Sequence, residues 1–197
     1  MTNTITSFLN SKGFLTFEGY SQQVPEQVDD LIKLTQHGKK RVIEIGFNAG
    51  HSAEVFLENN KDLELVSFDL GCHKYVQTAK EYIDTKYPNR HTLILGDSRK
   101  TIPEYLEKNK DKFDFIFIDG GHEYEIAKSD IQNCHHFAHS NSIVAMDDTM
   151  YKREWLQGWT IGPTKAWLEA LQQKQITEIE RKDYCNGRGM SWGKYVL

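Results

Sequence analysis

Apolar and polar positions alternate in a regular way along most of the chain. Five short runs are almost continuously apolar, as strands buried on both faces of a sheet are: residues 41–46, 63–71, 91–97, 113–119 and 142–148. Segments with the three- and four-residue apolar spacing of a helix lie before and between them: residues 24–34, 51–59, 75–83, 101–109 and 127–138. This alternation of strands and helices predicts βαβ units.

The pattern changes in the last quarter of the chain. Residues 163–173 form one more helical pattern, and we expect Trp167, Leu168 and Leu171 to face inward. Two strand patterns follow it, residues 175–181 and 190–197. The link between these strands is too short for a helical crossover, so we expect antiparallel neighbours. The whole pattern predicts an α/β fold: a doubly wound, Rossmann-like sheet of seven strands, mostly parallel, with an antiparallel C-terminal hairpin.

Composition narrows the class of protein. The 197 residues are enough for a single domain with a large core, and no linker interrupts them. The net charge of −4 is spread over interspersed acids and bases, so we expect no nucleic-acid partner. No apolar stretch approaches the roughly 20 residues that span a bilayer, and the first residues lack a signal-peptide pattern. Three cysteines without a CxxC pair indicate reduced thiols, and we expect a cytoplasmic protein.

Acidic residues stand at or near the end of every predicted parallel strand. They are Glu44, Asp69, Asp97, Asp119 and the adjacent pair Asp147 and Asp148. The carboxyl ends of parallel strands meet at one edge of a sheet, which is where open α/β sheets bind their ligands. Surface charge scattered at random would not sort in this way. The sequence therefore predicts a binding edge lined with carboxylates.

The loop after the first strand, Gly46–Gly50, contains two glycines that allow a ligand to approach the backbone closely. A tight strand-to-helix turn explains the same glycines equally well. Asp69 follows Gly50 by 19 positions, a spacing that suits an acid bound to a ribose diol. Glu44, just before the loop, would repel the pyrophosphate of a dinucleotide and attract a cationic ligand. The charge at this loop therefore favours S-adenosylmethionine over a nicotinamide cofactor.

These stretches resemble the class I S-adenosylmethionine-dependent methyltransferases. VIEIGFNAGHSA is similar to their first motif, SFDLG to their ribose motif and GDS to their adenine motif, and the final hairpin matches their fold. The resemblance implies that the following residues bind the donor: Glu44, Gly46, Asn48, Gly50 and Ser52 at the methionine part, Asp69 at the ribose, Asp97 and Ser98 at the adenine, with Asp119 beside them.

A second resemblance is narrower. IDGGHEYE and AMDDT are similar to the metal-dependent small-molecule O-methyltransferases, above all the macrolide-sugar group and more distantly the catechol enzymes. It implies Mg²⁺ ligands at Asp119, Asp147 and Asp148, and a catalytic base at His122. The sugar enzymes often carry glutamate where this chain has the shorter Asp147. Helix caps formed by Asp119, Asp147 and Asp148, and a loop histidine bonded to backbone at His122, are the simpler explanations of these residues.

The implied chemistry is consistent with the residue types. Three carboxylates at one point repel one another unless a cation neutralises them, and hard oxygen ligands suit Mg²⁺. A hydroxyl activated by the cation, with His122 accepting its proton, would attack the sulfonium methyl in line. We therefore expect Mg²⁺-dependent methyl transfer to a small-molecule hydroxyl. Three alternatives stay open: a metal-independent methyltransferase, a non-catalytic S-adenosylmethionine-binding module and a nicotinamide dehydrogenase.

Other features are less specific. Cys134, His135, His136 and His139 form a zinc-like cluster, for which a solvated helix end is the better explanation. Met150, Tyr151, Trp155 and Trp159 are candidates for a substrate lid. The expected organisation is a helical segment at 1–38, a cofactor-binding core at 39–150, and a lid, helix and hairpin at 151–197. The aromatic first 20 residues cover either the site or the partner subunit of a homo-oligomer.

Overall fold

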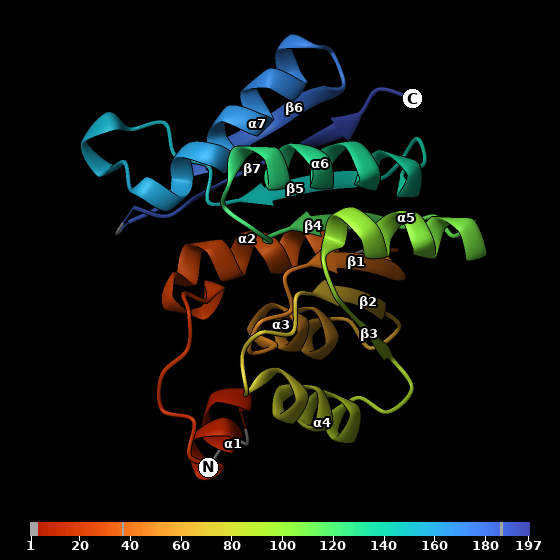
Figure 1. Cartoon of the computed structure of the whole chain (residues 1–197), viewed down its shortest axis with the longest axis vertical. Coiled ribbons are helices and arrows are strands. Elements are labelled where there is room, and N and C mark those ends of the chain that lie inside the picture. The colour runs from red at the N-terminus through yellow and green to blue at the C-terminus, as the bar shows by residue number, and fades with distance from the viewer. Residues whose placement is uncertain (1–3, 37, 186) are drawn as a thin grey trace.

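A computed structural model describes residues 4–36, 38–185 and 187–197 (Figure 1). The strands are β1 (Arg41–Ile45), β2 (Glu64–Asp69), β3 (His91–Leu95), β4 (Phe115–Ile118), β5 (Ile143–Asp147), β6 (Ile176–Asp183) and β7 (Gly189–Tyr195). The α-helices are α1 (Ile5–Ser11), α2 (Pro25–Thr35), α3 (His51–Asn59), α4 (Val76–Lys86), α5 (Ser98–Lys108), α6 (Tyr124–Cys134) and α7 (Ile161–Gln172). Short 3₁₀ turns are η1 (Ser21–Gln23), η2 (His135–Phe137), η3 (Arg153–Trp155) and η4 (Gly158–Thr160).

The seven strands form one sheet in the order β3-β2-β1-β4-β5-β7-β6. β1 to β5 pair in parallel, and β7 is antiparallel to both β5 and β6. The predicted fold class, including the C-terminal hairpin, is confirmed. Because strand order reverses between β1 and β4, the loops after these strands diverge to opposite faces and open a crevice at their carboxyl ends.

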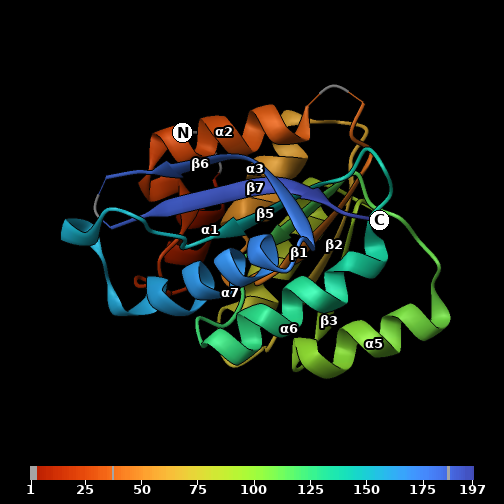
Figure 2. The ribbon, with the colours of Figure 1, turned by 90° about the horizontal axis from the view of Figure 1, so that it is seen from above.

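Helices cover both faces of the sheet, as Figure 2 shows: α2 and α3 lie on one side, and α5, α6 and α7 on the other. Alternate residues of β1 point into the two cores. Val42 joins the cluster that contains α1 to α4, while Ile43 and Ile45 join the cluster that contains α6 and α7. Burial on both faces explains why these strands are apolar throughout. Among the described residues, no helix has the length and apolarity needed to cross a bilayer.

Two details of the predicted helices are wrong. Leu168 does not face inward, because 43% of its surface is exposed while its neighbour Trp167 is fully buried. Successive helical residues point about 100° apart, so the burial of Trp167 turns Leu168 to solvent. The third crossover helix begins at Ser98 instead of residue 101, because Asp97 caps it by accepting a hydrogen bond from the Arg99 backbone N–H.

The chain between α1 and α2 crosses the edge where the parallel strands end (Figure 1). α1 is anchored beside α3, because the Ile5 backbone N–H donates to Glu54 Oε1. Further along, the ring of Tyr20 stacks on the ring of His51, with centroids 4.1 Å apart. His51 is the first residue of α3, directly after the glycine loop. The N-terminal segment therefore covers the glycine loop. The sequence had left open whether this segment covers the site or a partner subunit.

Candidate active site

The register of the sheet sets the ends of three strands side by side. Ile45 pairs with Ile118, and Ile118 pairs with Met146. The residues that follow are Gly46, Asp119 and Asp147. At Gly46 the backbone has φ +100°, and a Cβ there would lie 1.8 Å from the carbonyl oxygen of Asp119. Only glycine fits this position, so the glycine loop is pressed against the end of β4.

Asp69 lies against the glycine loop, at the end of β2. Its Oδ2 accepts a hydrogen bond of 2.7 Å from the Asn48 backbone N–H, and its Oδ1 accepts one of 2.7 Å from Gly71. Tyr75 Oη donates to Asn48 Oδ1 over 2.7 Å, and Asn48 itself has a left-handed φ of +49°. These contacts hold the loop in shape and leave Asp69 only partly buried, and its contact with a ribose stays a prediction.

Glu44 is placed differently from the prediction. Its side chain is fully buried under the loop, where Ser52 Oγ donates to Oε1 and Ser67 Oγ donates to Oε2 over 2.6 Å. Burial outweighs these bonds and raises the pKa of Glu44 to about 7. Glu44 and Ser52 therefore do not face the surface of the loop: they are bonded to each other inside it. Glu44 is the fourth of the five residues of β1. Its side chain therefore points into the packing layer on one face of the sheet, and not toward the end of the strand.

Asp97 and Ser98 lie at the start of α5, after β3. Asp97 pairs with the Arg99 guanidinium, with 2.7 Å between Oδ2 and NH2. The hydrogen bond from Arg99 lowers the pKa of the Asp97 carboxyl to about 2. Both residues are partly exposed at the same strand edge as Asp69. Contact with an adenine stays a prediction for them.

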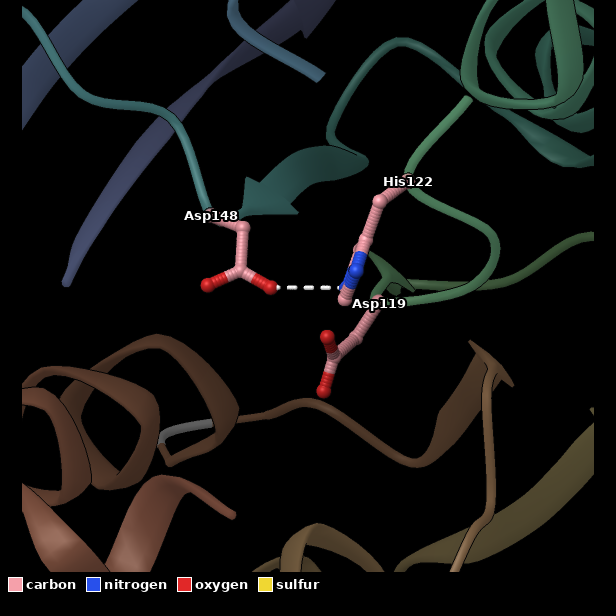
Figure 3. A group of neighbouring side chains, drawn as sticks. All are labelled: Asp119, His122 and Asp148. Atoms are coloured by element: carbon pink, nitrogen blue, oxygen red, sulfur yellow. Dashed lines mark ion pairs between the residues drawn. The ribbon is translucent and has the colours of Figure 1, made fainter. Parts of the chain in front are cut away.

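Three side chains converge where β4 and β5 end. Asp119, His122 and Asp148 each offer a ligand atom, and these atoms lie within 4.8 Å of one another (Figure 3). His122 Nε2 is 3.0 Å from Asp148 Oδ2, with the Asp148 side chain 4% exposed and that of His122 47%. Within the described residues, this is the group of acids and histidines whose geometry suits a metal ion.

Asp147 does not point to this group. Its Oδ1 accepts a hydrogen bond of 2.6 Å from Gln27 Nε2, and a second of 2.9 Å from the Asp148 backbone N–H. The structure therefore brings Asp119 and Asp148 together with His122, and turns Asp147 toward α2. Asp147 is the last residue of β5 and shares the face of Ala145, which packs in the core formed with α1 to α4, whereas Asp148 follows the strand in a left-handed conformation. The role of Asp147 as a metal ligand stays untested.

Electrostatic repulsion is strong among these acids. Burial, followed by the charges of Asp147 and Asp148, raises the pKa of Asp119 well above its usual value. Burial and the charge of Asp148 raise the pKa of Asp147 to about 7. The hydrogen bond to Asp148 raises the pKa of His122. Arg188 offers partial compensation, since its NH1 lies 3.5 Å from Asp148 Oδ1. A bound cation would relieve the repulsion further.

Sequence reasoning missed two residues of this region, Gln27 and Arg188. Gln27 lies in the first turn of α2, some 120 positions before its partner Asp147. Arg188 lies in the turn between β6 and β7. Its guanidinium packs against Gly19, where a Cβ would lie 1.9 Å from Arg188 Nη2. Neither carries a local motif. The sequence held one signal for Gln27, which is a polar residue on the apolar stripe of α2.

The remaining candidates separate in the structure. Met150 is 2% exposed and packs in the interior, and the Tyr151 hydroxyl is hydrogen-bonded to the Ser191 hydroxyl, while a lid role for them stays a prediction. Trp159 is 42% exposed, which leaves it available to a ligand. In the zinc-like cluster, Cys134 is the last residue of α6 and is buried in the core. Its histidines bond elsewhere: His135 to the Val196 carbonyl and His139 to Asp114.

Comparison with solved structures agrees with this fold. An O-methyltransferase from Bacillus cereus, solved with S-adenosylhomocysteine, superposes with a TM-score of 0.76 at 14% identity, over 98% of this chain and 91% of that one. The O-methyltransferase TomG from Streptomyces achromogenes, solved with S-adenosylmethionine, gives 0.70 at 13% identity, over 98% and 88%. A TDP-rhamnose 3′-O-methyltransferase of calicheamicin biosynthesis gives 0.66 at 18% identity, over 98% and 87%.

Sequence comparison gives the family. No curated protein sequence matches the chain. The protein family described as "Methyltransferase domain" matches residues 43–149, which run from β1 through the glycine loop to the residues after β5. This match spans more than half of the chain and contains both the glycine loop and the converging acids. The chain therefore belongs to the methyltransferase domain family, and it shares the fold of O-methyltransferases that were solved with S-adenosylhomocysteine or S-adenosylmethionine.

Proposed function

We propose that this methyltransferase transfers the methyl group of S-adenosylmethionine to a hydroxyl of a small molecule, with the help of a divalent cation. The convergence of Asp119, His122 and Asp148 beside the glycine loop carries the proposal. It supplies two acids and a base next to the position where the donor would lie. The carboxylates would hold a cation, and the imidazole would take a proton.

The donor would lie along the loop from Gly46 to Gly50. Asp69 is available to its ribose hydroxyls, and Asp97 and Ser98 to its adenine. Gly46, Asn48 and Gly50 would approach the methionine part with their backbone. Glu44 and Ser52 support the loop from within. At the pKa of about 7 set by burial, Glu44 is partly neutral at physiological pH, so we assign it no direct attraction for the sulfonium.

The residues at the acid edge fit a cation such as Mg²⁺. Asp148 Oδ1 is buried and, within the described residues, accepts no hydrogen bond. Its charged partner is the Arg188 guanidinium at 3.5 Å, and a cation would take the place of the hydrogen bond that this buried carboxylate oxygen lacks. Asp119 and Asp148 would hold the cation, which when bound would lower the pKa of a hydroxyl in contact with it.

His122 is the proposed base, and Asp148 orients it. Its Nε2 lies 3.0 Å from Asp148 Oδ2, and the hydrogen bond raises the pKa of His122. The imidazole would accept the hydroxyl proton while the oxygen attacks the methyl carbon and the carbon–sulfur bond breaks. S-adenosylhomocysteine leaves without charge on sulfur. Orientation of the two substrates is the main contribution of the chain, since it can supply roughly 7–11 kcal/mol of such a barrier.

The acceptor class follows from one structural neighbour and from the spacing of the cation and the base. The similar TDP-rhamnose 3′-O-methyltransferase acts on a sugar hydroxyl, as its description states. Two neighbouring oxygens on a sugar or a phenol would reach both the cation and the base. We therefore propose a small molecule with adjacent oxygen atoms. The chain offers no sign of a nucleic-acid partner, because acids and bases are interspersed and the net charge is −4.

A metal-independent reaction is the second candidate, and one observation favours it. The His122–Asp148 pair is already formed at 3.0 Å and would act as a base without any cation. Release of S-adenosylhomocysteine from sugar and catechol acceptors, measured in EDTA and then with added Mg²⁺, separates the two. We expect turnover to stop in EDTA and return with Mg²⁺. Asp119→Asn should remove the response to Mg²⁺, and Asp62→Asn, an exposed acid at the opposite edge, should keep it.

A further inference from the structure

A buried polar contact joins the N-terminal part of the chain to the end of β5. Gln27, in the first turn of α2, is fully buried, and its Nε2 donates to Asp147 Oδ1 over 2.6 Å. Asp147 is 3% exposed. A carboxylate only accepts hydrogen bonds, so the amide nitrogen of Gln27 must face it. The contact holds Oδ1 of Asp147 toward α2.

The same oxygen of Asp147 also controls the next residue. Asp147 Oδ1 accepts a hydrogen bond of 2.9 Å from the Asp148 backbone N–H. Asp148 has φ +55°, in the left-handed region that residues other than glycine rarely adopt. Such a conformation persists when surrounding contacts hold it, and aspartate tolerates it better than most residues. The Asp147 carboxylate, itself fixed by Gln27, is one such contact.

The left-handed turn decides where the Asp148 side chain points. Its Oδ2 lies 3.0 Å from His122 Nε2, and its buried Oδ1 faces Arg188 at 3.5 Å. On the other side of the turn, Thr149 is fixed to β7 by its backbone N–H, 3.2 Å from the Gly189 carbonyl. With Thr149 held, a change of φ at Asp148 would swing its carboxylate away from Asp119 and His122.

We propose that Gln27 and Asp147 are positioning residues: their buried contact holds the left-handed turn at Asp148 and thereby aims its carboxylate at the cation and at the base. In this role Asp147 supports the site through its neighbour. The part that concerns the cation rests on the function proposed above, while the placement of Asp148 stands without it.

The first test is Gln27→Leu, which keeps the approximate size of the side chain and removes the donor. In crystal structures of the two proteins, we expect Asp148 to leave the left-handed conformation and to lose its contact with His122. The affinity for Mn²⁺ alone, measured by calorimetry, should fall about 10–100-fold, as is typical when support of a ligand is removed. Gln36→Leu, the same change at the end of α2, is the matched control and should leave both readouts unchanged.

The second test uses Asp147→Asn and Asp147→Ala. The asparagine keeps an oxygen that accepts both hydrogen bonds, so the affinity for Mn²⁺ should stay within about threefold of the original. The alanine loses both bonds and should behave like Gln27→Leu. Melting temperatures establish that each variant is folded. If leucine at position 27 prevents folding, Gln27→Met is the replacement, because methionine is unbranched like glutamine.

Two results would overturn the proposal. In one, Asp148 keeps its position in the Gln27→Leu crystal. In the other, Gln27→Leu binds Mn²⁺ more tightly, because a released Asp147 has become a ligand. Failure of the proposed function would look different: the unaltered protein would bind no Mn²⁺, while Gln27→Leu would still displace Asp148. In that case the positioning role survives and the cation role does not.

Discussion

Two buried carboxylates at the same edge of the sheet have opposite surroundings. Glu44, under the glycine loop, accepts hydrogen bonds from two serine hydroxyls, one on each oxygen. Asp148, at the end of β5, has one oxygen beside His122 and one that accepts no hydrogen bond within the described residues. Both residues are acids at strand ends in the sequence. Satisfied hydrogen bonds indicate a structural role for Glu44, and the unsatisfied oxygen indicates a functional role for Asp148.

The difference extends to the neighbours of each acid. Around Glu44, His91 Nε2 lies 2.9 Å from Ser67 Oγ and extends the hydrogen bonds of the carboxylate into the core. Around Asp148, the neighbours are further acids that repel it, a half-exposed histidine, and the Arg188 guanidinium, which compensates part of the charge from 3.5 Å. The donor side of the edge is therefore built for rigidity. The acid side holds charge that a substrate or a cation would neutralise.

The largest effect is expected at Asp119. Asp119→Ala should lower turnover by more than about a thousandfold, because it removes a cation-holding carboxylate and the charge that orients the reacting groups. It should not lower the melting temperature, since it also relieves repulsion from Asp147 and Asp148. Rates of S-adenosylhomocysteine release and thermal melts check both parts. A variant that retains turnover would place Asp119 with the structural acids.

The next effect is expected at His122. His122→Ala should reduce turnover by roughly 10²–10⁴-fold, the usual contribution of a general base. The affinity for Mn²⁺ should change little, because the two carboxylates remain. Kinetics and calorimetry on the same preparation separate the roles. Full activity would exclude His122 as the base, and loss of Mn²⁺ binding would make it a ligand.

Glu44 should affect stability and its dependence on pH. Its pKa rises from 4.5 to about 7 on folding, so the folded state holds the proton more tightly. The stabilisation is complete below pH 4.5 and is lost as the pH rises through 7. Glu44→Gln should reduce this loss by at most about 3 kcal/mol, since one pKa unit corresponds to about 1.36 kcal/mol. Urea unfolding of the unaltered protein and of Glu44→Gln, at pH 4.5 and pH 8, measures this loss of stability. An equal loss in the two proteins would contradict the prediction.

A smaller effect is expected at Asp69. Asp69→Ala should weaken binding of S-adenosylhomocysteine about 10-fold, because the ribose loses an acceptor and the Asn48 backbone N–H loses its partner. The maximal rate at saturating donor should change less than the affinity. Calorimetry and donor-saturation kinetics check this. Unchanged affinity would remove Asp69 from the donor site.

Local pattern was sufficient for much of the fold. Apolar runs located the parallel strands and the terminal hairpin, because strands covered on both faces must be apolar. Finer features depended on contacts that are distant in sequence. The phase of α7 follows from the burial of Trp167, so Leu168 was placed wrongly. The start of α5 is set by the capping residue Asp97. Apolar spacing alone placed the start of this helix three residues later.

The candidate site was predictable as a place, and less so as a geometry. Strand ends located Asp69, Asp119 and Asp148 at one edge because parallel strands end together. The inward direction of Glu44 and the turn of Asp147 toward Gln27 depend on the orientation of single side chains. A one-residue change of position along a strand reverses that orientation. The contact between Gln27 and Asp147 joins residues 120 positions apart, which one sequence cannot reveal.

The central claim is that the acid side of this edge holds a divalent cation next to the methyl donor. Anomalous diffraction from a crystal grown with Mn²⁺ and S-adenosylhomocysteine tests it most directly. The account predicts one manganese peak in contact with Asp119 and Asp148, and the homocysteine sulfur on the glycine loop facing it. A crystal with S-adenosylhomocysteine bound and no peak at these carboxylates would contradict the claim.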